Sequence, residues 1–118
     1  MHELMVVARL FPEVQSGDKT SNMRWHENPI VPGPMTYRCE GEPERTVVVW
    51  VAGVTDVVLS QAAAFVGKAD LWPVDVMLDG MREHYPAITL DDVVQIVEHL
   101  TPDQTRLRMA GSVPKQNL

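Results

Sequence analysis

The residues of this chain that are best suited to chemistry lie between Gly17 and Arg24, where a glycine turn runs into an extended segment. In a regular strand Lys19 would face away from Asn22 and Arg24, whereas a twist after Gly17 would bring the three together. A lysine held against apolar surroundings loses solvation, so its pKa falls and it can act as a base or nucleophile. Arg24 offers a rigid fork for carbonyl or phosphate oxygens. The segment therefore predicts one wall of a ligand pocket; the alternative is that Lys19 is an exposed residue of a turn.

Two further positions could take part in the same chemistry. Asp70 precedes Trp72-Pro73, where it could complement the start of a helix or, alternatively, orient Lys19 and accept its proton. Trp25 is followed by His26, a pair suited to base stacking with proton transfer. The alternative for Trp25 is an anchor that packs on the rim of the fold.

The composition limits the ligand to something small. The net charge is −6, and the ten Lys and Arg residues form no run, which argues against binding of long nucleic acid. A nucleoside, a nucleotide or a short single strand fits this charge better.

The sequence gives no sign of a disulfide, a metal or a cofactor. Cys39 is the single cysteine, and three of the histidines, His2, His84 and His99, show no metal-ligand spacing, so we expect none of these groups. No apolar run is long enough for a membrane span, and the first residues lack a signal sequence, so we expect a cytoplasmic protein that does not engage a membrane.

The hydrophobic patterns predict the elements that would position these residues. Strands are expected at 2–8, 35–39 and 45–59, helical turns at 10–17 and helices at 61–66 and 72–84. Residues 18–24 run extended, and 28–34 form a proline-rich loop. Ser60 is expected to cap the helix that follows it, Gly67 to end that helix, and Gly53 to mark a bulge or bend in the long strand.

The segment after Pro86 has two interpretations. Thr89 to Asp92 resembles a capping box for a helix, whereas residues 93–97 are rich in β-branched side chains. We favour a closing strand over 92–100. The whole pattern then predicts an α+β fold in residues 1–101, with a small, mostly antiparallel sheet curled into a barrel, and a polar tail over 102–118.

The segment from Leu10 to Arg24 resembles the signature of ASCH domains, which share the PUA-like β-barrel. A short helix ends in Gly-x-Lys-Thr, followed by x-x-x-Arg, and Pro32-Gly33 then precedes the next strand. The order of elements over residues 4–100 is closest to the small bacterial 4-acetylcytidine amidohydrolases, including the helices that end in Tyr85-Pro86.

This resemblance implies an activity and a set of residues for it. Lys19 would activate water or attack the acetyl carbonyl, and Asp70, where the family has glutamate, would orient Lys19. Asn22, where the family has threonine, would stabilise the oxyanion or position water. The expected substrate contacts are Thr20, Arg24 and Trp25.

The resemblance is also compatible with two other classes of protein. In an RNA-binding PUA-like module, in some relatives a ribonuclease, Lys19 and Arg24 would hold phosphate, Trp25 would stack on a base and Asp70 would be structural. A small regulatory or interaction domain would hold no ligand at all. The acidic net charge favours the nucleoside pocket.

Overall fold

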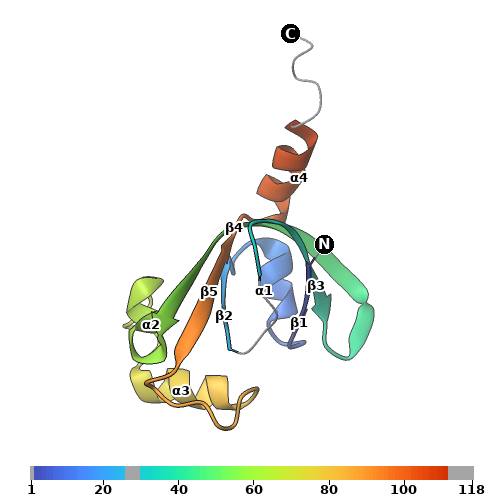
Figure 1. Cartoon of the computed structure of the whole chain (residues 1–118). Coiled ribbons are helices and arrows are strands. Elements are labelled where there is room, and N and C mark those ends of the chain that lie inside the picture. The colour runs from blue at the N-terminus through green and yellow to red at the C-terminus, as the bar shows by residue number, and fades with distance from the viewer. Residues whose placement is uncertain (1, 26–29, 112–118) are drawn as a thin grey trace. The chain divides into compact units, whose positions relative to one another are not determined.

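The computed structural model describes residues 2–25 and 30–111 and contains, within them, five strands and four helices (Figure 1). In chain order these are β1 (His2–Val6), α1 (Phe11–Ser16), β2 (Ser21–Arg24), β3 (Gly33–Cys39), β4 (Glu42–Val58), α2 (Leu59–Phe65), α3 (Val74–Arg82), β5 (Val93–His99) and α4 (Pro102–Gly111). The hydrogen-bonded strand order is β1-β3-β4-β5-β2. The predicted α+β class is confirmed, whereas the PUA-like barrel stays a prediction.

The chain divides into two compact units. The first unit comprises Met1–Thr20, Ile30–Gly53 and Glu98–Leu118, and the second comprises Ser21–Pro29 and Val54–Val97. Strand β4 passes from the first unit to the second at Gly53, where a bend was expected, and it is one continuous strand there. Between β3 and β4 the structure records a register shift at Arg38–Cys39, next to the hairpin turn. Each unit has its own core.

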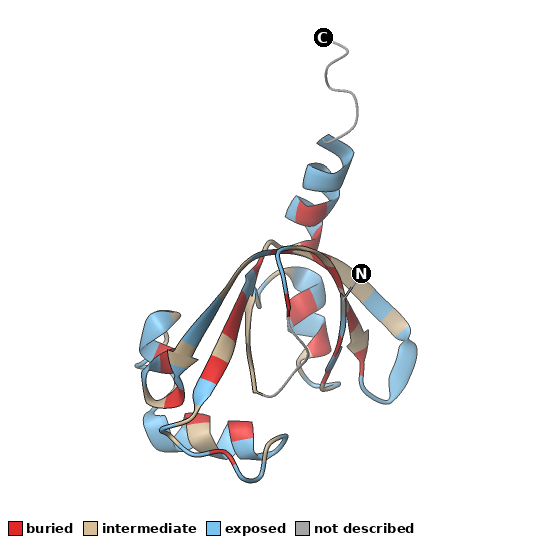
Figure 2. Cartoon of the chain, viewed as in Figure 1, coloured by how far each residue is buried: buried red, intermediate tan, exposed pale blue. Residues whose placement is uncertain are grey.

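The core of the first unit is built on the alternating face of β3. Met35, Tyr37 and Cys39 are fully buried, and the residues between them are only half-buried (Figure 2). This period of two is that of a strand with one face on a core. β3 pairs in parallel with β1 and antiparallel with β4, and α1 adds the buried side chains of Phe11 and Val14. Cys39 is thus a residue of this core.

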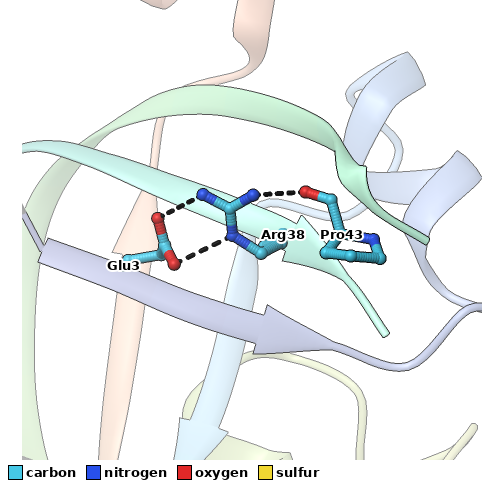
Figure 3. A network of polar contacts seen from close by, with 3 residues as sticks. All are labelled: Glu3, Arg38 and Pro43. Carbon is cyan, nitrogen blue, oxygen red and sulfur yellow. Dashed lines mark hydrogen bonds and ion pairs between the residues drawn. The ribbon is translucent and has the colours of Figure 1, made fainter. Parts of the chain in front are cut away.

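An ion pair with two hydrogen bonds joins the outer strand β1 to β3 (Figure 3). The Glu3 carboxylate accepts from Arg38 Nε at 2.9 Å and from Arg38 Nη2 at 2.8 Å, and Arg38 Nη1 donates to the carbonyl of Pro43. The hydrogen bonds from Arg38 hold the pKa of Glu3 below its ordinary value. Because both side chains are partly exposed, the pair fixes the register of β1 more than it stabilises the fold.

Residues 102–111 form helix α4, in a segment where the sequence analysis predicts only a polar tail and no helix. Its start is a capping box: Thr101 Oγ1 accepts from the Gln104 N–H at 3.1 Å, and Gln104 Oε1 accepts from the Thr101 N–H at 2.9 Å. Pro102 begins the helix, a position where its missing N–H does no harm. The polar composition after Pro102 concealed this signal in the sequence.

Helix α4 is fastened to the first unit by one buried hydroxyl group. Thr105 is 1% exposed, and its Oγ1 accepts the backbone N–H of Trp50 at 2.8 Å. The guanidinium of Arg108 lies 4.5 Å from the centre of the Trp50 ring. The attachment of α4 therefore depends on the hydrogen bond between Thr105 and Trp50, which cannot be predicted from a local sequence pattern.

We expect Thr105→Val to lower the free energy of unfolding by about 1–3 kcal/mol, because the Trp50 N–H would be left without an acceptor. Thr105→Ser, which keeps the hydroxyl, should retain most of the stability. Urea unfolding measures both, with Thr55→Val on the exposed face of β4 as the matched control. Equal midpoints for Thr105→Val and wild type would contradict this role.

The second unit packs α2 and α3 against β5. Its buried cluster consists of Leu59, Ala62, Ala63, Met77, Met81, Ile88, Val94 and Ile96. Met77 and Met81 are one turn apart and form the buried stripe of α3, as the helical spacing predicted. Helix α3 begins at Val74 with Pro73 as its N-cap, so the predicted start at Trp72, with Pro73 inside the first turn, is two residues too early.

Helix α2 starts without the serine cap that the sequence suggested. It begins at Leu59, one residue before Ser60, and no side chain caps it. The backbone N–H of Leu59 donates to the carbonyl of Asp92 at 2.8 Å, and that of Ser60 donates to Leu90 at 3.1 Å. Because main-chain carbonyls satisfy these donors, the helix needs no hydroxyl at its start. The predicted left-handed residue is present at Gly67, with φ of 75°.

The segment Thr89–Asp92 closes a turn in front of a strand. The Thr89 N–H donates to Asp92 Oδ2 at 2.8 Å, and the Asp92 N–H donates back to the Thr89 carbonyl at 3.1 Å. The residues that resembled a helix cap therefore form hydrogen bonds with each other within the turn and cap no helix. The predicted strand is confirmed as β5. β5 carries one edge of the candidate site described next.

Candidate functional site

Lys19 lies on a backbone that is fixed by the end of α1. Gly17 adopts the left-handed conformation, with φ of 91°, and its N–H donates to the Val14 carbonyl at 3.3 Å. The Lys19 N–H then donates to the Glu13 carbonyl at 2.9 Å. The predicted helix stop at Gly17 is confirmed, and the Lys19 side chain that follows it is half-buried. Main-chain hydrogen bonds therefore fix the backbone from which the Lys19 side chain extends.

His99, at the end of β5, is the residue of this region that the sequence did not single out. It is 5% exposed, and its Nδ1 lies 2.8 Å from the Leu100 carbonyl, so Nδ1 carries the hydrogen and donates it. Its Nε2 is buried and has no hydrogen-bond partner among residues 2–25 and 30–111. The ring stands edge-on to Tyr37, with centroids 5.3 Å apart, and the His99 N–H donates to the Thr20 carbonyl at 2.9 Å.

The imidazole of His99 is held in its neutral form. Burial is the largest cause that lowers its pKa below 6.5, and the positive charge of Lys19 lowers it further, against the hydrogen bond to Leu100. The first unit therefore brings a half-buried ammonium close to a neutral ring whose Nε2 lone pair is unused. The sequence analysis considered His99 only as a metal ligand. The property that distinguishes His99 is its burial, which the sequence does not show.

The buried His99 should make the protein lose stability in mild acid. Its pKa is lower in the folded than in the unfolded chain, so the unfolded chain binds more protons as the pH falls below about 6.5. The free energy of unfolding should then fall by at most about 1.4 kcal/mol per pH unit until the lower folded value is reached. His99→Phe should flatten this slope in urea unfolding between neutral pH and pH 5, whereas His84→Phe, at an exposed histidine, should not. An unchanged slope in His99→Phe would contradict the assignment.

Asn22 and Arg24 are half-buried in β2, within the second unit. Trp25 follows and stands edge-on to Tyr85, with ring centroids 5.9 Å apart at 90°, against the buried cluster of that unit. This is the packing that the anchor interpretation of Trp25 expects, whereas stacking on a base stays a prediction. His26 lies outside the described residues.

Asp70 is exposed, in the turn between α2 and α3. The acidic residue in the first turn of α3 is Asp75, and Pro73 occupies the N-cap, so Asp70 does not cap this helix. The same turn is closed by hydrogen bonds from the N–H groups of Leu71 and Trp72 to the Lys68 carbonyl. Lys19 and Thr20 belong to the first unit and the other predicted site residues to the second, so the pairing of Lys19 with Asp70 stays a prediction.

Two further properties of the described part of the chain bear on its chemistry. Nowhere in residues 2–25 and 30–111 do three or more His, Cys, Asp or Glu side chains gather closely enough to hold a metal ion. Within the same ranges no helix combines the length and the apolar character that crossing a membrane requires.

Comparison of the chain with protein-family models, with curated proteins and with solved structures found no match.

Proposed function

We propose that this chain is an ASCH-type amidohydrolase that removes the acyl group from a modified nucleoside such as 4-acetylcytidine, on a PUA-like barrel. The observation that carries the proposal is the setting of Lys19. A half-buried lysine is fixed by the left-handed turn at Gly17 and lies close to the neutral, buried ring of His99. In its neutral form a lysine so held can act as a base or nucleophile, and in its charged form it can donate to an oxygen on which negative charge develops.

The proposed reaction is hydrolysis of a linear amide without a metal or cofactor. Water adds to the acyl carbon, the tetrahedral intermediate collapses, and the C–N bond breaks to give a carboxylate and the exocyclic amine, which takes the proton. Lys19 activates the water or attacks the carbonyl, and the Asn22 amide donates to the oxyanion. Asp70 supplies the carboxylate that orients Lys19. Thr20, Arg24 and Trp25 contact the nucleoside.

One observation favours this reaction over an RNA-binding module. The net charge of −6 opposes binding of a polyanion, which depends on neutralising many phosphates. A small, neutral nucleoside as ligand is compatible with this charge.

The direct test is release of acetate and cytidine from 4-acetylcytidine by the purified protein, followed by chromatography of the nucleosides. Release above the level of the heat-denatured protein is the expected result. A parallel titration with a short single-stranded RNA at several salt concentrations tests the other class of function. No turnover, together with RNA affinity that falls steeply with salt, would replace the hydrolase proposal with the RNA-binding module.

A further inference from the structure

The register of β2 against β5 can be read from one hydrogen bond. The two strands are neighbours in the sheet, and the His99 N–H donates to the Thr20 carbonyl. Thr20 immediately precedes β2 and His99 ends β5, so the strands run antiparallel. Counting from this pair places Arg24 opposite Gln95, because each step forward along β2 is a step back along β5.

The burial of the flanking residues supports this register. The same count places Met23 opposite Ile96; Ile96 belongs to the apolar cluster of the second unit, and Met23 packs against that cluster. Side chains that are opposite in an antiparallel pair share one face, and successive side chains alternate. Arg24 and Gln95 therefore share the other face of the strand pair, and Asn22, two residues before Arg24, lies on that face too.

Gln95 carries an unsatisfied polar atom on this face. The side chain is half-buried, and its Oε1 is buried without a hydrogen-bond partner in the part of the chain that the structure describes. The Nε atom of Arg24 is buried as well. A buried acceptor without a donor destabilises a fold, so an apolar residue would serve the sheet better than glutamine here. The unused acceptor points to a ligand that brings its own N–H.

We propose that Gln95 determines the base specificity of the site by reading the Watson–Crick edge of cytosine together with Arg24 and Asn22. This inference rests on the proposed nucleoside hydrolase function and names the residues that recognise its base. Cytosine presents one donor, the N4–H, beside two acceptors, N3 and O2. Gln95 Oε1 accepts the N4–H, and the guanidinium of Arg24 donates to the two acceptors. An N4-acylated cytosine keeps one N4–H, so substrate and product share this recognition.

Uracil presents the opposite pattern at the position that Gln95 reads. Its O4 is an acceptor, and two acceptors that face each other cannot form a hydrogen bond. Glutamine can turn its amide to offer the NH₂ group instead, so the discrimination in the wild type is moderate. A glutamate at this position is an acceptor only and would sharpen the preference for cytosine.

The test measures the affinity of the whole protein for cytidine and uridine by calorimetry, in wild type and three variants. Gln95→Leu should weaken cytidine binding roughly tenfold, the loss of one hydrogen bond, and remove the preference for cytidine over uridine. Gln95→Glu should keep cytidine binding and increase the preference. Gln61→Leu, at an exposed glutamine of α2, should change neither affinity. Because Gln95→Leu removes an unsatisfied buried atom, its melting temperature without ligand should equal or exceed that of the wild type.

The outcomes separate this inference from the proposed reaction. Acetate release from 4-acetylcytidine that is the same in wild type and Gln95→Leu, with equal cytidine affinity, overturns the role of Gln95 and leaves the hydrolase standing. Cytidine binding that depends on Gln95, without any acetate release, keeps the base site and overturns the reaction. Wild-type protein that binds neither nucleoside overturns the base site. A titration with single-stranded oligocytidine distinguishes a free nucleoside from a base within RNA.

Discussion

Replacing Lys19 by alanine should lower kcat for acetate release from 4-acetylcytidine by about 10²–10⁴-fold and leave the protein folded. The side chain supplies the proposed base, nucleophile or oxyanion partner, so its removal takes away the group that acts on the carbonyl. The fold should tolerate the change, because the turn is held by the Lys19 main-chain N–H and by Gly17. Turnover with 4-acetylcytidine and a urea unfolding curve measure the two effects separately.

The chain offers a matched lysine as control for this result. Lys68 lies with its ammonium 5.0 Å from the centre of the Trp72 ring, in the turn before α3. Lys68→Ala removes the same side chain from the second unit, and we expect its kcat to stay within about twofold of wild type. Lys19→Ala that keeps kcat near the wild-type value, in a folded protein, would remove Lys19 from the mechanism and with it the hydrolase proposal.

The sequence predicted those parts of the fold whose signals are local. The strand at 35–39, the helix that carries Met77 and Met81, and the left-handed stop at Gly17 all depend on residues that are neighbours in the chain. The predicted strand at 92–100 is confirmed for the same reason, since residues 93–97 are rich in β-branched side chains, which are enriched in strands.

The features that sequence reasoning missed depend on partners that are distant along the chain. Helix α4 is polar and weakly patterned, and it is held by Thr105, whose partner Trp50 lies 55 residues earlier. The start of α2 is satisfied by the carbonyls of Leu90 and Asp92, so the serine that follows Leu59 had no cap to make. Neither partner can be identified until the strands are paired.

The residues of the candidate site also fall into those with a local signal in the sequence and those that only the folded chain distinguishes. Lys19 and Arg24 were found because their residue types and spacing are recorded in one short segment. The sequence did not single out His99 and Gln95 in this way, because each is distinguished by a buried atom that has no hydrogen-bond partner within residues 2–25 and 30–111, which is a property of the folded chain. Strands β2 and β5 are neighbours in the sheet, and the His99 N–H donates to the Thr20 carbonyl, within the segment that the sequence did single out.

The turn that carries Lys19 should itself be sensitive to a single methyl group. We expect Gly17→Ala to lower the free energy of unfolding by about 1–2 kcal/mol from the left-handed backbone alone. A Cβ at this position would also lie 3.0 Å from Thr101 Cγ2 and 3.1 Å from Thr101 Cβ, and such overpacking adds about 1–3 kcal/mol. Thr101 cannot yield freely, because its hydroxyl and N–H form the capping box of α4 with Gln104. Urea unfolding measures the total.

A second glycine separates the two contributions. Gly41, in the hairpin turn, has φ of 85°, and a Cβ there would meet nothing within 4 Å, so Gly41→Ala should show the backbone cost alone. Thr101→Ser removes the methyl group and keeps the cap, so it should partly restore the stability of Gly17→Ala. Because Lys19 follows Gly17 by two residues, Gly17→Ala should also lower kcat, whereas Gly41→Ala should not. Equal losses of stability in the two alanine variants would show that Thr101 yields without cost, and an unchanged kcat in Gly17→Ala would show that the turn does not position Lys19.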